Sequence, residues 1–368
     1  MDSYADMLPA DELLPLRLRA LYENFGYRRF RIGKFESYDM YMENRSFLRS
    51  EGIITFTNAQ GRLMALKPDV TLSIVKNVNA DDGSQKFYYN ESVFRIEHKG
   101  EEYREISQMG LEYLGADTGF AQAEVVLLAL DSLSAIEPEI ALDVSHMSFI
   151  SGLLDSLRIF DESRESALEL LRRKDADGIR RLCEALRLPE EDASFLVRAS
   201  RFRLPLSEAL EAAGALVRCS AMSDALGELK ELCEALNAQG KAASVFLDFS
   251  VINDMDYYNG LVFRGYVRSA KRAVLAGGRY DKLVKRFEKD LPSIGFAIYL
   301  SELERVLHTL SLHDVDTLIL YGDANAATVA EAVSEAAKSG SVRAERTAPA
   351  GLRARRVVRL GEGALSDA

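Results

Sequence analysis

Polar residues gather in four short segments of this sequence, each set within apolar runs. In the first, residues 66–71 (LKPDVT), Asp69 places a carboxylate close to the hydroxyl of Thr71. Both groups accept hydrogen bonds from an ammonium ligand. The alternative is that Asp69 or Thr71 caps a helix that begins with the apolar run LSIV, and from the residues alone we favour the cap.

The second segment combines residues 94–97 (FRIE) with residues 103–112 (YREISQMGLE). In an extended strand Arg95 and Glu97 share one face, as do Gln108, Gly110 and Glu112. If the two strands pair, they form a polar platform around a glycine that leaves room above it. The alternative is an exposed strand face with cross-strand ion pairs, which is the commoner situation.

The third and fourth segments are residues 256–260 (DYYNG) and residues 276–281 (AGGRYD). Tandem tyrosines provide a ring wall and a phenolic donor, and tandem glycines let a ligand approach the backbone. Each segment alone is equally compatible with a turn beside core tyrosines.

The elements that position these segments follow from periodicity. Apolar spacing predicts helices over residues 11–25 and 119–138, with short strand-like runs between residues 27 and 140. Within those runs, IITFTNAQGRLMAL predicts a hairpin. Residues 142–240 are rich in Leu, Ala, Glu and Arg and predict a helical insertion.

Strand patterns resume with SVFLDFSVI, YYNGLVFRGYV and KRAVLAGG, and a helix is predicted from Gly295 to about Leu310. A short strand–helix–strand tail follows. An antiparallel sheet interrupted by helices is an α+β domain, and its polar strand face predicts a ligand on the open side. The expected divisions are two core parts around the helical insertion and a short α/β segment: residues 1–141, 142–240, 241–312 and 313–368.

Composition excludes several classes of function. The 368 residues are 48% hydrophobic and 28% charged, and 46 Lys and Arg against 57 Asp and Glu give a net charge of −11. Such a surface disfavours non-specific nucleic-acid binding. No apolar window has the length of a membrane span, the start does not read as a signal peptide, and three cysteines without CxxC spacing indicate a reducing cytoplasm. Four scattered histidines and no nucleotide motif predict neither a metal nor a cofactor.

Taken in order, LKPDVT, FRIE, YREISQMGLE, MDYYNG, AGGRYDKLV and PSIGFAIYLSEL resemble the catalytic core of class II histidyl-tRNA synthetases and their paralogues. The resemblance runs from about residue 8 to residue 308. It implies the antiparallel synthetase core with an inserted helical domain. It also implies a homodimer built through the first motif, which FRIGKFESYDM matches with Gly33 at the family's proline.

The resemblance further implies a pocket for histidine. Asp69, where the synthetases usually carry Glu, would hold the ammonium group, and Glu112 would pair with the imidazole. The implied histidine-binding set is Asp69, Thr71, Gln108, Glu112, Tyr258 and Tyr280.

Adenylate formation in the synthetases needs three arginines that neutralise ATP. Arg95 is retained, with Glu97 beside it, but Asn253 and Glu302 stand at the other two positions. A glutamate in place of an arginine turns attraction for a phosphate into repulsion, which at ~4 Å costs several kcal/mol in a partly desolvated cleft. Arg305 would substitute for Glu302 only if its helix shifted by nearly a turn.

A retained histidine pocket, lost arginines and a shortened tail resemble the regulatory subunit of short-form ATP phosphoribosyltransferase. In that family the synthetase-like subunit is not catalytic, assembles with a short catalytic subunit and senses histidine as feedback inhibitor. The alternative is a histidyl-tRNA synthetase-like enzyme that forms histidyl-adenylate. A tRNA-binding scaffold rests only on the arginine-rich residues 343–359, so we expect no tRNA partner and no membrane partner.

Overall fold

The computed structural model describes most of the chain, namely residues 10–43, 52–96, 102–116, 119–253, 255, 257–303 and 313–360. By its internal contacts the chain divides into two compact units: residues 17–302 form one, and residues 1–16 together with 303–368 form the other. Among the described residues, no helix combines the length and the apolar character that a membrane span requires.

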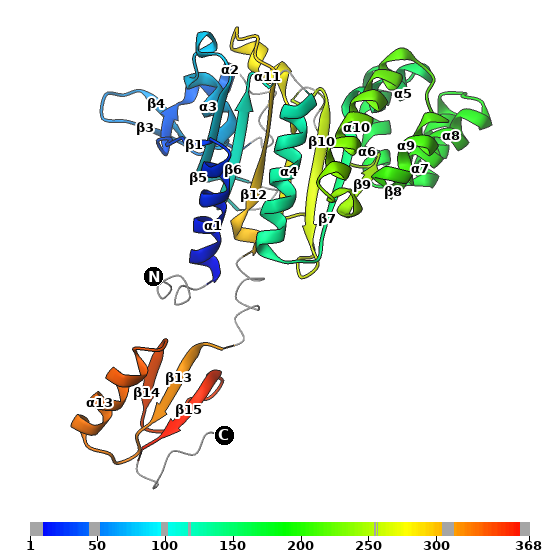
Figure 1. The fold of residues 1–368 in the computed structure, drawn as a ribbon. Helices are drawn as coiled ribbons and strands as arrows, with labels where there is room; N and C mark the ends of the chain where they lie inside the picture. The colour runs from blue at the N-terminus through cyan, green and yellow to red at the C-terminus, as the bar shows by residue number, and fades with distance from the viewer. Residues whose placement is uncertain are drawn as a thin grey trace. The chain divides into compact units, whose positions relative to one another are not determined.

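The larger unit is built on a nine-stranded sheet (Figure 1). In spatial order its strands are β1 (Arg28–Arg29), β5 (Gln85–Arg95), β6 (Arg104–Leu114), β12 (Ser293–Tyr299), β11 (Leu275–Arg279), β10 (Leu261–Val267), β7 (Ile140–His146), β9 (Val245–Asp248) and β8 (Arg203–Pro205). The strands from β5 to β7 pair antiparallel, as predicted.

The sheet also contains two parallel pairs, β1–β5 and β7–β9, beside the predicted antiparallel core. A parallel pair needs a long crossover connection, and the helices between β7 and β9 supply one. The sheet is therefore mixed, and its antiparallel part carries the polar segments.

Two helices cover one face of this sheet, α1 (Ala10–Asn24) and α4 (Gly119–Ile136) (Figure 1). The ring of Tyr22 contacts Tyr88 and Phe296 at 6.1 Å between centroids, and its hydroxyl lies 2.9 Å from the Ser132 hydroxyl of α4. Because successive residues of a strand point to opposite faces, Tyr88 faces these helices and Tyr89 faces the other side. Both helices match the predicted ranges within two residues.

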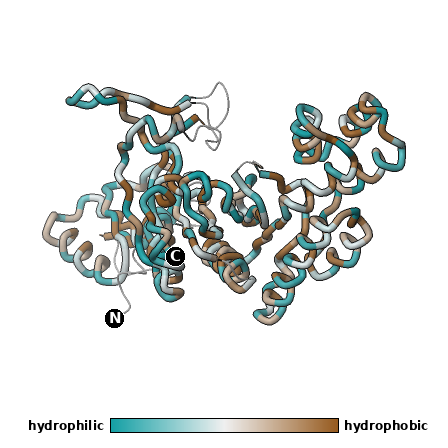
Figure 2. The backbone as a smooth tube through the Cα atoms, turned by 90° about the horizontal axis from the view of Figure 1, so that it is seen from above, coloured by the Kyte–Doolittle hydropathy of each residue, from teal (hydrophilic) through white to brown (hydrophobic). Residues whose placement is uncertain are grey.

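The helical insertion begins at Met147 and not at residue 142 as predicted, because residues 142–146 lie in β7. Its helices are α5 (Met147–Ser156), α6 (Asp161–Arg172), α7 (Ala176–Ala185), α8 (Glu190–Ser200), α9 (Leu206–Gly214) and α10 (Ser220–Ala238). Hydrophobic and hydrophilic residues alternate along these helices (Figure 2). Their apolar stripes are buried, for example at Leu171, Leu196 and Leu229.

A small sheet flanks the main one, with β2 (Phe35–Ser37) and β3 (Thr55–Thr57) on either side of β4 (Leu63–Leu66). The β3–β4 pair is antiparallel, which confirms the predicted hairpin. Helix α2 (Tyr38–Glu43) follows β2, and helix α3 (Val70–Asn77) follows β4.

Helix α3 is fixed at both ends by side chains from other elements. Near its start, the Ser73 hydroxyl donates to a Glu36 carboxylate oxygen of β2 at 2.8 Å. At its end, the Lys289 ammonium donates to the carbonyl oxygens of Val75 and Val78, each at 2.6 Å. A cation at the carboxyl end of a helix complements its dipole.

The predicted helix from Gly295 to about Leu310 is wrong at its start, because residues 293–299 form β12 in the middle of the sheet. Helix begins only at Leu300, and residues 304–312, which include Arg305, lie outside the described part of the chain. A short apolar run buried on both faces has no periodicity that separates strand from helix. Between β11 and β12 lies a short helix, α11 (Asp281–Arg286).

The other unit contains a parallel three-stranded sheet. Its central strand is β13 (Val315–Leu320), flanked by β14 (Val342–Glu345) and β15 (Ala354–Arg359), and helix α13 (Ala326–Ala336) connects β13 to β14. The Asn325 side chain caps α13 by accepting from the Thr328 amide at 3.0 Å. The predicted strand–helix–strand tail is confirmed.

Candidate functional site

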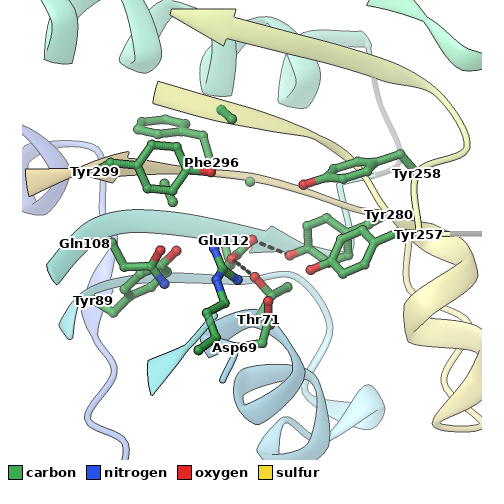
Figure 3. A pocket seen from close by; sticks show the side chains of 14 residues that line it. Asp69, Thr71, Tyr89, Gln108, Glu112, Tyr257, Tyr258, Tyr280, Phe296 and Tyr299 are labelled. Atoms are coloured by element: carbon green, nitrogen blue, oxygen red, sulfur yellow. Dashed lines mark hydrogen bonds between the residues drawn. The ribbon is translucent and has the colours of Figure 1, made fainter. Parts of the chain in front are cut away.

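A pocket with ≈ 430 Å³ of space, partly open to solvent, lies over the main sheet (Figure 3). It is lined by side chains of β5, β6, β11 and β12, by the start of α3 and by the segment before β10. All six residues of the predicted histidine-binding set line it, and so does Arg95. The other lining residues are Tyr89, Tyr257, Ala276, Gly295, Phe296, Ala297 and Tyr299.

Glu112 of β6 forms the floor of this pocket and is only 2% exposed. The Thr71 hydroxyl donates to its Oε1 at 2.6 Å, and the Tyr280 phenol donates to its Oε2 at 2.5 Å (Figure 3). Burial raises the pKa of Glu112 to about 8, although both hydrogen bonds act in the opposite direction. Asp69 nearby raises this pKa further through its charge.

Position 295 on the neighbouring strand must be glycine for this carboxyl group to fit. A Cβ atom there would lie 1.8 Å from Glu112 Oε2 and 2.5 Å from the Leu111 carbonyl oxygen. Gly295 pairs directly opposite Glu112 in the β6–β12 register. The bare backbone of β12 thus makes room for the acid that the ligand would meet.

Asp69 has both of the roles that the sequence left open. Its Oδ1 accepts from the Leu72 amide at 2.9 Å, so it caps α3, as favoured from the residues alone. It also lines the pocket. Among the described residues no further hydrogen bond to its side chain is present, which leaves Oδ2 for a ligand.

Gln108 and Tyr89 supply polar groups at the end of the pocket that lies away from Tyr257, Tyr258 and Tyr280 (Figure 3). Gln108 is buried and its amide makes no side-chain hydrogen bond within the described chain. The room that Gly110 was predicted to leave is occupied, because a Cβ atom there would lie 2.6 Å from the Tyr89 hydroxyl oxygen. The glycine therefore admits a phenol from β5, and that phenol faces the pocket.

Three tyrosines form one wall of the pocket (Figure 3). The ring of Tyr257 lies 4.6 Å from Tyr258 and 6.0 Å from Tyr280, measured between centroids. The segment is held by Asn259, whose Oδ1 accepts from the Asp281 amide at 2.8 Å. Its Nδ2 donates to Asp281 Oδ2 at 3.1 Å.

The positions implied to bind nucleotide do not converge in the same way. Arg95 lines the pocket and donates to the Pro68 carbonyl oxygen at 3.4 Å. Asn253 is not among the lining residues, and its Oδ1 accepts from the Arg264 guanidinium at 3.3 Å. Glu302 does not line the pocket either, and Glu97 lies outside the described residues.

Two of the pocket's tyrosines were missed from the sequence, although a signal existed for one of them. Tyr89 lies six residues before Arg95 on β5, so strand alternation places both on one face. Tyr299 was hidden by the helix predicted for its segment, and it pairs opposite Gln108 in β12. Tyr257 belongs to the tandem tyrosines that predicted a ring wall.

The lining groups can hold a small polar ligand. Two carboxyl groups, Asp69 and Glu112, lie where N–H donors of a small ligand could meet them, and Arg95 provides one cation. In the part of the chain that the structure describes, no cluster of three or more His, Cys, Asp or Glu side chains could hold a metal ion.

The raised pKa of Glu112 predicts a pH-dependent stability. Because the folded-state pKa of about 8 lies above the ordinary value of 4.5, the contribution of Glu112 to the free energy of unfolding is complete below pH 4.5 and is lost as the pH rises toward 8. The wild type loses roughly 1.4 kcal/mol of unfolding free energy per pH unit between these two pKa values. Glu112→Gln has no titrating group at this position and should not show the loss. Urea unfolding at pH 5 and pH 8.5 should show the variant gaining a few kcal/mol on the wild type at the higher pH.

The matched control is Glu190→Gln on α8, whose side chain is 79% exposed. The difference in unfolding free energy between Glu190→Gln and the wild type should be the same at both pH values. An equally constant difference for Glu112→Gln would show that this carboxyl group titrates normally.

Several known proteins are similar in sequence to this chain. Regulatory subunits of ATP phosphoribosyltransferase from Oceanobacillus iheyensis and Acetivibrio thermocellus are 26% and 27% identical to the chain over 283 and 334 residues. The first alignment covers 76% of this chain and 69% of the relative, and the second covers 88% and 80%.

Solved structures share the fold. An ATP phosphoribosyltransferase regulatory subunit/histidyl-tRNA synthetase from Bacillus halodurans has a TM-score of 0.74 at 22% identity, covering 96% of this chain and 95% of the other. The ATP phosphoribosyl transferase (HisG:HisZ) complex from Thermotoga maritima contains a chain with a TM-score of 0.63 at 19% identity, covering 79% and 97%.

Histidyl-tRNA synthetase from Nostoc has a TM-score of 0.70 at 16% identity, over 92% of this chain and 83% of the synthetase. Identities this low show a common fold, and a fold alone does not fix an activity. The family model described as histidyl-tRNA synthetase matches residues 5–303, which is most of the sequence. The chain belongs to the histidyl-tRNA synthetase family.

Proposed function

We propose that this chain is a non-catalytic regulatory subunit of short-form ATP phosphoribosyltransferase and that its pocket binds free histidine as the feedback signal. The observation that carries the proposal is the buried Glu112 carboxyl group, hydrogen-bonded to Thr71 and Tyr280 and facing a pocket that also contains Asp69. The names of the similar regulatory subunits support the same role.

Histidine matches the distribution of groups in this pocket. Its imidazole and its ammonium group both donate N–H bonds, and Glu112 and Asp69 provide one acceptor site for each. The rings of Tyr257, Tyr258 and Tyr280 provide an aromatic wall for a planar imidazole. An N–H donor also lowers the cost of ionising Glu112, so ligand binding is coupled to its charge.

The same pocket is poorly equipped for ATP. Among the residues that the structure describes, Arg95 is the one cation that lines the pocket, and two carboxyl groups share the space. Asn253 stands at a position where the resemblance expects an arginine, and it is hydrogen-bonded to Arg264 outside the pocket lining. This charge distribution disfavours adenylate formation, the alternative function.

As a regulatory subunit, the chain must bind histidine with different affinities in two states of an assembly, because equal affinities shift no equilibrium. The proposed partner is the short catalytic subunit of ATP phosphoribosyltransferase. The Thermotoga maritima complex, whose name gives two subunits, supports such a hetero-oligomer.

Glu112→Ala should weaken histidine binding by at least tenfold, because a buried hydrogen bond to a charged group contributes roughly 1.5–3 kcal/mol. Isothermal titration calorimetry with the purified chain measures this directly. Glu190→Ala, at the exposed α8 site, should bind like the wild type. Equal affinity for Glu112→Ala and wild type would refute the assignment of this carboxyl group.

Mixing the chain with a short catalytic subunit should give a complex with phosphoribosyltransferase activity that histidine suppresses. The complex with Glu112→Ala should remain active and lose most of its sensitivity to histidine. Absence of a complex in size-exclusion chromatography would contradict the proposal. Histidine-dependent ATP–pyrophosphate exchange by the chain alone would instead favour the adenylating enzyme.

A second copy of the chain is proposed to cover the small sheet β2–β4–β3. Phe35 and Phe56 are 61% and 37% exposed, and their rings lie 5.3 Å apart on one face of that sheet. Exposed apolar clusters of this kind mark interfaces. Phe35 lies in the segment that resembles the family's dimer-forming motif.

Phe35→Lys should therefore convert a homodimer to a monomer, because it places a charge in an apolar interface. Light scattering coupled to size-exclusion chromatography gives the mass. Phe160→Lys is the control, since Phe160 is 51% exposed but belongs to the helical insertion. A monomeric wild type at tens of micromolar, or a dimeric Phe35→Lys, would disprove this interface.

A further inference from the structure

Four polar side chains meet where the helical insertion joins the sheet. At their centre is Glu228 of α10, whose Oε2 lies 3.2 Å from Gln122 Nε2 and 3.4 Å from His146 Nε2. The Arg279 guanidinium is 3.9 Å from the same oxygen. Gln122, His146 and Arg279 belong to α4, β7 and β11, so the three partners are core residues and Glu228 is the insertion's contribution.

Glu228 is charged at neutral pH. Its hydrogen bond to His146 is the main cause of a pKa lowered to about 2, against the opposing effect of burial. His146 itself is almost fully buried, with 3% of its side chain exposed. A pocket with ≈ 270 Å³ of space, partly open to solvent, lies beside this cluster and is lined by both residues, so the contact is not tightly packed on every side.

Arg279 connects this cluster to the pocket through its neighbour in the chain. Tyr280 follows it and donates to Glu112 at 2.5 Å, and Asp281 accepts from Arg279 Nε at 2.8 Å. Arg279, Tyr280 and Asp281 therefore connect the cluster around Glu228 to the pocket that contains Glu112. The middle one contacts the pocket acid, and its neighbours pair with each other beside Glu228.

A second connection passes through the tyrosine wall. Asn259, which follows Tyr258, exchanges two hydrogen bonds with Asp281. The stem of Arg279 lies against Gly260, where a Cβ atom would come within 2.9 Å of Arg279 Cδ. Movement of this wall therefore displaces the guanidinium that faces α10.

We propose that Glu228 and Arg279 couple the pocket to the helical insertion, so that a ligand on Glu112 changes how firmly α10 is held against the core. A ligand N–H that binds Glu112 competes with the Tyr280 phenol and shifts the residue next to Arg279. At 3.9 Å the Arg279–Glu228 pair is beyond hydrogen-bond length, so a small shift toward Glu228 would form a direct bond. The ligand in this scheme is histidine, which rests on the proposed function.

Hydrogen exchange measured by mass spectrometry on the full chain tests the coupling. Histidine should slow exchange of the α10 amides in the wild type, and Glu228→Gln should lose this response while still binding histidine. Linkage requires the same substitution to shift the histidine Kd by about fivefold or more, although Glu228 does not line the pocket. Glu231→Gln is the control, since Glu231 is on α10 and lines the same cavity, and it should keep both properties.

A ligand-free arm keeps this test independent of the proposed function. Tyr280→Phe deletes only the hydroxyl that contacts Glu112, the same contact that a ligand would displace, so it should slow exchange in α10 without any ligand. Unchanged α10 exchange in Tyr280→Phe would overturn the coupling, and so would a normal histidine response in Glu228→Gln. A wild type that gives no heat with histidine in calorimetry would overturn histidine as the ligand and leave the Tyr280→Phe result to decide the coupling.

Discussion

A carboxyl group buried in the middle of a sheet constrains much of this structure. Glu112 needs hydrogen bonds or a proton to be tolerated there, and its pKa of about 8 reflects that cost. Its two donors come from distant parts of the chain, Thr71 at the start of α3 and Tyr280 just before α11. Gly295 on β12 must stay without a side chain beside it. The β6–β12 register and the positions of α3 and α11 are therefore all linked to Glu112.

Supporting contacts explain how α3 holds its part of the site. Asp69 caps the helix, Ser73 bonds to Glu36 of the small sheet, and Lys289 bonds to the carbonyl groups at the far end. These bonds fix the Thr71 hydroxyl relative to β6. The pocket thus depends also on Glu36 of β2 and on Lys289 of the loop after α11, which do not line it.

Much of this arrangement could be predicted from the sequence, and the failures have physical causes. Alternation on β5 and β6 predicted the face that carries Gln108 and Glu112, because period-two patterns are local. The strand β12 was predicted as helix, since a run buried on both faces carries no period. For the same reason Tyr299 of β12 was not predicted to line the pocket. The parallel β7–β9 pair depends on the path of a long insertion, which no local pattern encodes.

Membership of the histidyl-tRNA synthetase family fixes the scaffold, and the pocket's charges distinguish between functions on it. The most direct measurement is a crystal structure of the chain grown with saturating histidine. We expect an imidazole nitrogen within ~3 Å of the Glu112 carboxylate and an ammonium group facing Asp69. An empty pocket, or histidine bound only at another site, would contradict this expectation.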